Sequence, residues 1–75
     1  MLNIVVGDDM ELRSNIEKLV LKSGLQKKFI AQKLKVSVAQ LRNYETGYSL
    51  IPIDKGYILA DLLGCKVDDL YEKEG

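Results

Sequence analysis

Polar side chains recur at helical spacing in the stretch KVSVAQLRNYETG, residues 35–47. A helical wheel at about 100° per residue puts Tyr44 and Glu45 within roughly 60° of Leu41, so these three residues would share a docked face. The free face would carry a methyl group, a guanidinium, an amide and a hydroxyl, from Ala39, Arg42, Asn43 and Thr46. In a DNA major groove Arg pairs with guanine and Asn with adenine, while Val38 and Ala39 have methyl groups suited to thymine. The pattern is therefore typical of a helix that reads base edges, and the alternative is a solvated helix face without a partner.

Local signals predict that this helix is the second of a pair. Ser37 begins it, with Gln40 at the third helical position, so we expect the Ser37 hydroxyl to accept from the Gln40 backbone N–H. The Gln40 amide would then reach back to complete a capping box, or would face DNA instead. We predict this helix over residues 38–45, closed by Gly47, and a preceding helix over residues 26–35. The short connection through Val36 is what a helix-turn-helix requires, with its second helix in the groove and its first across the DNA backbone.

The charges are sorted along the chain although they sum to zero. Residues 22–42 hold six basic side chains and no acid, whereas the part from residue 47 onward holds three basic side chains and six acids. The six basic residues are Lys22, Lys27, Lys28, Lys33, Lys35 and Arg42. This asymmetry indicates a polyanion partner for the middle of the chain, and its alternative is a solvated surface.

Length and composition indicate one folded domain and no enzyme. The chain has 75 residues, 47% of them apolar and 29% charged, which is ordinary for a small globular protein. It has no His and a single cysteine, Cys65, which we expect to be a buried free thiol. Paired carboxylates at residues 8–9 and 68–69 suit helix starts, so we expect no catalytic site, cofactor or metal. With no apolar run of about 18 residues and no secretory signal, we expect a cytoplasmic protein.

The N-terminal residues predict an extended arm followed by a helix. Residues 2–6, LNIVV, form a short β-branched run that is typical of a strand. Asp8 stands three residues before Glu11, as in a capping box, and apolar spacing then predicts a helix over residues 9–22 that stops at Gly24.

The C-terminal half predicts two more helices. Pro52 suits the first turn of the next helix or the residue before it, and Gly64 suits its end. Apolar residues around 67–71 predict a short fifth helix with acids in its first turn. The predicted fold is therefore an all-α bundle of five short helices, divided into an arm at residues 1–7 and a helix-turn-helix domain at residues 8–75.

Two stretches, GLQKKFIAQKLKVSVAQLRNYETG and ILADLLGCKVDDLY, resemble the Cro/repressor, or XRE-type, helix-turn-helix family. The points of resemblance are Ala31, Val36, Ser37, Leu41, Glu45 and Gly47, followed by Ala60, Leu63, Gly64, Val67 and Leu70. The resemblance implies a compact helical bundle that binds operator DNA, commonly as a dimer on a palindromic site. It also implies DNA contacts for Gln26, Lys27, Ser37, Val38, Ala39, Arg42, Asn43 and Tyr48, with Ser49 beside the backbone and Gln40 in either a DNA contact or the capping role. We add Thr46 to the DNA-binding set from its place on the free face of the wheel.

The chain departs from the family pattern at three positions. Lys27 stands where the family usually has Gln, and Lys35 stands where it often has Gly, which a left-handed conformation tolerates at some cost. Val20 stands where an Arg often pairs with the Glu of the second helix, and we hypothesise that Lys27 replaces that partner for Glu45. The loop GYSLIP lacks the basic residues common there, so we expect modest and salt-sensitive DNA binding.

The apolar arm suggests a route to a dimer. An unpaired apolar strand invites pairing with its copy in a second subunit, and the alternative is an arm packed on its own monomer. The side chains that would take part are Leu2, Ile4, Val5 and Val6. A rival function is a protein-interaction module on the same scaffold, because a fold alone does not establish DNA binding. In neither case do we expect a membrane or a small-molecule ligand.

Overall fold

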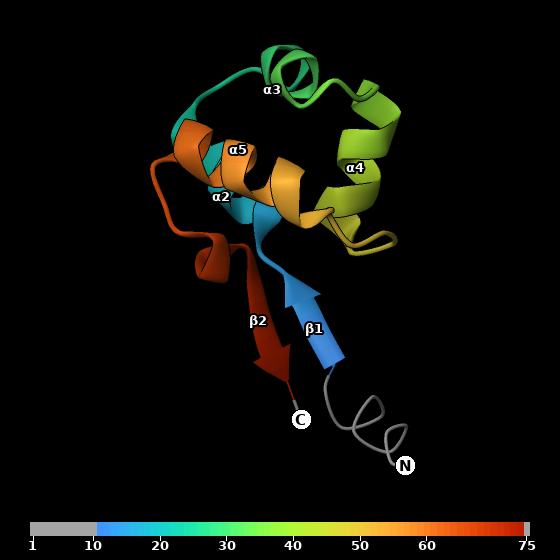
Figure 1. Ribbon diagram of the computed structural model, residues 1–75, viewed down its shortest axis with the longest axis vertical. Coiled ribbons are helices and arrows are strands. Elements are labelled where there is room, and N and C mark those ends of the chain that lie inside the picture. Colours follow the sequence, from blue (N-terminus) through green and yellow to red (C-terminus); the bar gives the residue numbers. More distant parts are fainter. Residues whose placement is uncertain (1–10, 75) are drawn as a thin grey trace.

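The computed structural model describes residues 11–74. Within these residues, four α-helices form a bundle, and the first and last described segments pair as a two-stranded antiparallel sheet that projects from it (Figure 1). In chain order the elements are β1 (Glu11–Ser14), α2 (Ile16–Ser23), α3 (Lys27–Leu34), α4 (Val38–Thr46), α5 (Ile53–Leu63), the 3-10 turn η1 (Val67–Leu70) and β2 (Tyr71–Glu74). The predicted helical bundle is confirmed.

One core of buried side chains holds the elements together. Its members are Ile16, Val20, Ile30, Ala31, Leu34, Leu41, Tyr44, Leu59 and Leu70, so each helix and the 3-10 turn contribute. In α2 Val20 follows Ile16 by four residues, and in α3 Leu34 follows Ile30 by four and Ala31 by three, which puts the core residues on one face of each helix. The core therefore anchors each helix along one side and leaves its other side in solvent.

The turn between α3 and α4 is closed by a left-handed residue and a helix cap. Lys35 has φ 60°, as predicted, and its backbone N–H donates to Gln32 O at 3.1 Å. The Ser37 hydroxyl accepts from the Gln40 N–H at 3.0 Å, so the predicted cap of α4 is confirmed. At its other end α4 stops at Gly47, whose φ of 85° favours glycine.

The prediction of a helix from residue 9 is wrong for its first part. Residues Glu11–Ser14 form β1, and α2 begins only at Ile16. The reason is a distant partner, because β1 pairs with β2 in a register that joins Glu11 to Glu74 and Ser14 to Tyr71. Glu11 thus begins a strand, while Asp8 and the predicted arm at residues 2–6 lie outside the described residues. The stop at Gly24 is confirmed.

The predicted fifth helix is also shorter than expected. Val67–Leu70 form a 3-10 turn, and Tyr71 begins β2 instead of continuing a helix. The Asp69 carboxylate accepts from the Lys66 backbone N–H at 3.0 Å, which closes a single turn. Four residues give only one such turn before β1 takes up the backbone groups of the following residues.

Candidate nucleic-acid interface

The docked and free faces of α4 are those that the helical wheel predicts. Leu41, Tyr44 and Glu45 are buried, whereas Asn43 on the opposite side is half-buried. The other candidate residues of this face, Ser37, Val38, Ala39, Arg42 and Thr46, are exposed, with Val38 47% exposed. In Figure 1, α3 is seen end-on and α4 runs down the side of the bundle. This arrangement leaves the outer face of α4 open along its length.

A small residue and a tight turn bring the two helices together. Ala31 of α3 is buried, and its carbonyl accepts from the Val36 N–H at 3.0 Å. Val36 packs against the core at its edge. Because Ala31 has only a methyl side chain, α4 can approach α3 closely at this point.

An ion pair joins the start of α3 to the end of α4. Lys27 Nζ lies 3.2 Å from Glu45 Oε1, with the Glu45 side chain fully buried and the Lys27 side chain 37% exposed. The hypothesis that Lys27 is the partner of Glu45 is therefore confirmed. The other carboxylate oxygen, Oε2, is buried and has no hydrogen-bond partner among residues 11–74. Since a buried carboxylate without a cation is costly, Lys27 holds α4 against α3.

Of the two roles predicted for the Gln40 side chain, a capping contact or a DNA contact, the capping contact is not formed. Gln40 Oε1 accepts from Asn43 Nδ2 at 3.2 Å, one helical turn away, in place of the expected contact with the Ser37 backbone. The amide of Asn43 has a second N–H and a carbonyl oxygen, which are the two groups that adenine recognition requires. The Gln40–Asn43 contact therefore orients the Asn43 amide on the outer face of α4.

The remaining candidates lie at the two ends of the helix pair. Gln26 is the exposed residue that precedes α3, and Tyr48 is 83% exposed in the loop after α4. Ser49 is half-buried, and its N–H donates to the Asn43 carbonyl at 3.1 Å. The Thr46 hydroxyl donates to the same carbonyl at 3.3 Å and accepts from the Tyr48 N–H. The loop is thus tied to the last turn of α4.

A helix-turn-helix family model matches residues 16–70, which is most of the chain. The protein belongs to the Cro/repressor (XRE-type) helix-turn-helix family. It is a DNA-binding regulator of that class. No curated protein matches the chain.

In this helix-turn-helix protein, basic side chains that no nearby acid in the sequence offsets lie around the pair α3 and α4. Lys28, Lys35 and Arg42 are exposed, and the Lys33 ammonium lies 5.5 Å from the centre of the Phe29 ring. No acid occurs between residues 22 and 42 to offset these charges. Within residues 11–74, no group of three or more His, Cys, Asp and Glu side chains is placed to hold a metal ion, and no helix is long and apolar enough to cross a membrane.

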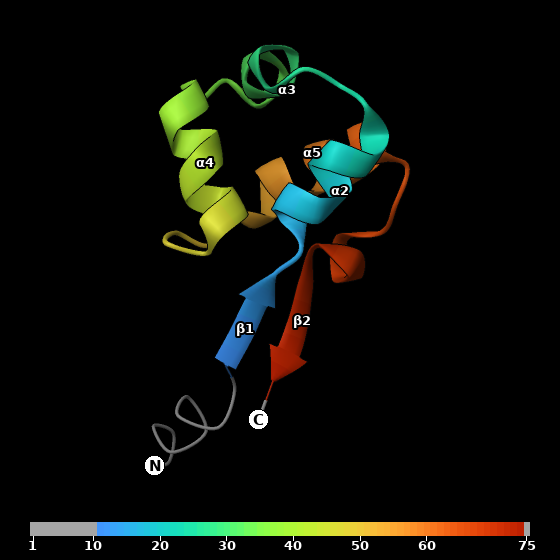
Figure 2. The same ribbon diagram turned by 180° about the vertical axis from the view of Figure 1, so that it is seen from behind.

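The two-stranded sheet of β1 and β2 lies outside the matched family region and contacts the end of α4. Figures 1 and 2 place this sheet at the end of the molecule opposite α3. The Ser14 hydroxyl donates to the Tyr44 carbonyl at 2.8 Å, and the Tyr71 hydroxyl accepts from the Ile51 N–H at 3.0 Å. Burial raises the pKa of the Tyr71 phenol above its ordinary value, which favours the protonated form. No local motif predicted these roles of Ser14 and Tyr71, because each side chain hydrogen-bonds to a residue at least 20 positions away in the chain.

Replacing Tyr71 by Phe tests this brace. The substitution keeps the ring but leaves the Ile51 N–H without an acceptor, so we expect the free energy of unfolding to fall by about 1 kcal/mol. Amide hydrogen exchange at Ile51 should accelerate. The matched control is Tyr57→Phe. Tyr57 is 63% exposed, so this variant should have the same free energy of unfolding as wild type. Equal stability and equal exchange in the two variants would show that the β1–β2 sheet does not hold the loop.

Proposed function

We propose that this protein binds a specific duplex DNA site and regulates transcription, with α4 in the major groove. Arg42 and Asn43 would read guanine and adenine, with Ser37, Val38, Ala39 and Gln40 beside them. Gln26, Lys27, Thr46 and Tyr48 would contact the sugar-phosphate backbone, which positions the helix without reading sequence. The observation that carries this proposal is the exposed outer face of α4, held rigid by buried Leu41 and Tyr44 and by the Lys27–Glu45 pair.

Lys27 is proposed for two roles that are compatible. An ammonium group has three donors, and the Glu45 carboxylate uses one of them at 3.2 Å. The Lys27 side chain is 37% exposed, so its remaining donors are open to a phosphate.

We also propose that the protein acts as a homodimer on a palindromic or near-palindromic operator. A two-fold dimer presents two α4 helices to successive major grooves, about 34 Å apart. One route to this dimer is pairing of the arm through Leu2, Ile4, Val5 and Val6, which lie outside the described residues. We propose no catalytic role for the protein.

A salt titration of binding to random duplex DNA tests the proposed function. If four to six phosphates are neutralised, the affinity should fall with salt at a log–log slope of about 4 to 5 in magnitude. The protein should be retained on heparin at low salt and released as salt rises. Indifference to duplex DNA, heparin and salt in a folded sample would favour a protein-interaction module instead.

A further inference from the structure

Lys35 has a backbone conformation that suits glycine better than lysine. It is the only residue other than glycine with a positive φ among residues 11–74, at 60°. The other three helices, α2, α4 and α5, each end at a glycine with positive φ. Glycine adopts this conformation freely, whereas the Cβ atom of any other residue crowds the backbone and lowers stability. The turn alone would therefore favour glycine at residue 35, and the lysine side chain needs a separate explanation.

No contact inside the described chain explains the Lys35 side chain. It is exposed, and its ammonium has no hydrogen-bond or ion-pair partner among residues 11–74. A lysine can stabilise the end of a helix by donating to its last carbonyls. In α3, however, two of these carbonyls accept from backbone N–H groups, and the Leu34 carbonyl accepts from the Lys55 ammonium at 3.1 Å. The Lys35 ammonium is therefore open to a partner outside the chain.

The position of Lys35 in the helix pair indicates which partner this is. Lys35 precedes Ser37, the cap of α4, by two residues, so it lies beside the end of α4 whose residues contact base edges in a helix-turn-helix. It follows Lys28 by seven residues, or about two turns, so the two lysines lie on about the same side of α3. Ala31, where α4 approaches α3, falls between them on this side. Because the first helix of the motif crosses the DNA backbone next to the groove that holds the second, the side of α3 nearest α4 would face phosphate groups.

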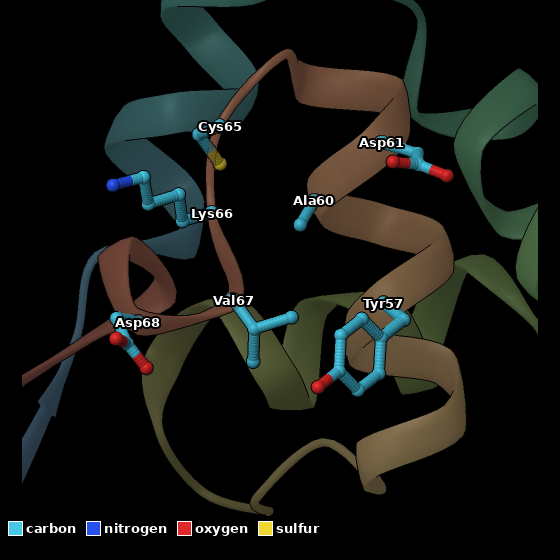
Figure 3. Close-up of a pocket in the computed structure, with 7 residues that line it drawn as sticks. All are labelled: Tyr57, Ala60, Asp61, Cys65, Lys66, Val67 and Asp68. Carbon is cyan, nitrogen blue, oxygen red and sulfur yellow. The ribbon is translucent and has the colours of Figure 1, made fainter.

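The surface around α5 and η1 does not suit a polyanion. A hollow of about 330 Å³ lies between these elements, with Tyr57 forming one wall (Figure 3). The Asp61 and Asp68 carboxylates and the Lys66 ammonium point away from the opening, so acids outnumber bases around it. Cys65 also lines the hollow, and it is partly buried, not fully buried as predicted from the sequence. A phosphate is therefore repelled here, and the acid-free run at residues 22–42 is the part of the chain that attracts one.

We propose that the Lys35 ammonium binds a phosphate group of the DNA backbone beside the N-terminal end of α4. The inference rests on the proposed function and adds to it a contact from the turn between the two helices. An ammonium is a compact point charge with three donors, which suits a phosphate and does not select a base pair. Residues in unfavourable backbone conformations cluster at functional sites, where the function depends on them. Lys35 therefore raises the affinity for every duplex while it lowers the stability of the turn.

The variant Lys35→Gly should change stability and DNA affinity in opposite directions. Glycine relieves the backbone, so we expect the melting temperature to rise by about 2 to 6 °C. The variant also lacks one phosphate contact, so the log–log salt slope should fall by about 1 in magnitude. At about 0.1 M salt this corresponds to a roughly five- to tenfold loss of affinity, equal for the preferred site and for random duplex. Thermal unfolding gives the first quantity, and titration of labelled duplexes over a range of salt concentrations gives the second.

Two further variants separate the charge of Lys35 from its backbone. Lys35→Arg keeps a cation and a Cβ atom, so it should keep both the salt slope and the melting temperature of wild type. Lys33→Gln is the matched control, because it removes a charge of the same helix about 160° away from Lys35. The Lys33 ammonium lies 5.5 Å from the centre of the Phe29 ring, and its loss should leave the salt slope unchanged.

The other outcomes overturn the inference. Lys35→Gly with the affinity and salt slope of wild type, or Lys33→Gln with an equal loss, would show that Lys35 contacts no phosphate. A lower melting temperature for Lys35→Gly would show that the lysine stabilises the fold instead. Wild type that binds no duplex at low salt would overturn the proposed function as well, whereas wild type that binds, with Lys35→Gly unaffected, overturns this inference alone.

Discussion

Replacing Lys27 by Met should lower the free energy of unfolding by about 2 to 3 kcal/mol. The substitution leaves the Glu45 carboxylate buried with no cation, and breaking a fully buried pair in this way costs about 3 to 5 kcal/mol. We expect less here because the Lys27 side chain is 37% exposed and water reaches it. For a domain of this size the loss corresponds to a fall in melting temperature of roughly 10 to 20 °C. Thermal or urea unfolding measures it.

The matched control for Lys27→Met is Lys28→Met. Lys28 is the next residue of the same helix and is exposed, so its replacement should change stability by less than about 0.5 kcal/mol. Adding Glu45→Gln to Lys27→Met should restore part of the loss, because a neutral amide is cheaper to bury than an unpaired carboxylate. Equal stability of the two single variants would mean that the ion pair does not hold α3 and α4 together.

Replacing Arg42 by Ala should weaken binding to the preferred DNA site by about tenfold to a hundredfold. A bidentate contact between Arg and guanine is worth about 1 to 3 kcal/mol of discrimination, and the exposed Arg42 is the only guanidinium on α4. The melting temperature should not change, since Arg42 is outside the core. Titration of a labelled duplex gives the affinity, and duplexes changed at one base pair should show where discrimination is lost.

The control for Arg42→Ala is Lys73→Ala, which removes one positive charge from β2, outside the helix pair. It should lower affinity slightly and equally for every duplex, because it alters only the long-range field. If the two variants lose affinity by the same factor on all sequences, Arg42 contributes charge and not base readout.

The turn between α3 and α4 and the buried face of α4 were predictable from sequence because their signals are local. Ser37, Val36 and Gly47 mark the turn and both ends of α4 within a dozen residues, and the wheel then separates Leu41 from Arg42. The Lys27–Glu45 pair was predictable because Val20 stands where the family usually has the cation. Helical periodicity did not show that the Gln40 amide would accept from Asn43. The Ser37 backbone and the Asn43 side chain both lay within reach of Gln40, and periodicity does not choose between them.

The β1–β2 sheet was not predictable because its stabilising contacts are not local. Leu12 lies at helical spacing from Ile16, which favours a helix, yet Leu12 is 47% exposed and pairs with Lys73 in the sheet. Leu12 and Lys73 are separated by 60 residues, so neither short segment carries a local sequence signal for the pairing. In the same way, the brace formed by Ser14 and Tyr71 depends on backbone atoms of α4 and the following loop, whose positions are set by the finished bundle.

Selection of bound sequences from random duplex DNA at low salt tests most directly whether the outer face of α4 reads the major groove. We expect an enriched motif with two related half-sites about one helical turn apart. Asn43→Ala should lose the preference for adenine at one position of each half-site, with the rest of the motif unchanged. A folded protein that enriches no motif, or one whose motif is unaffected by substitution of both Arg42 and Asn43, would contradict this account.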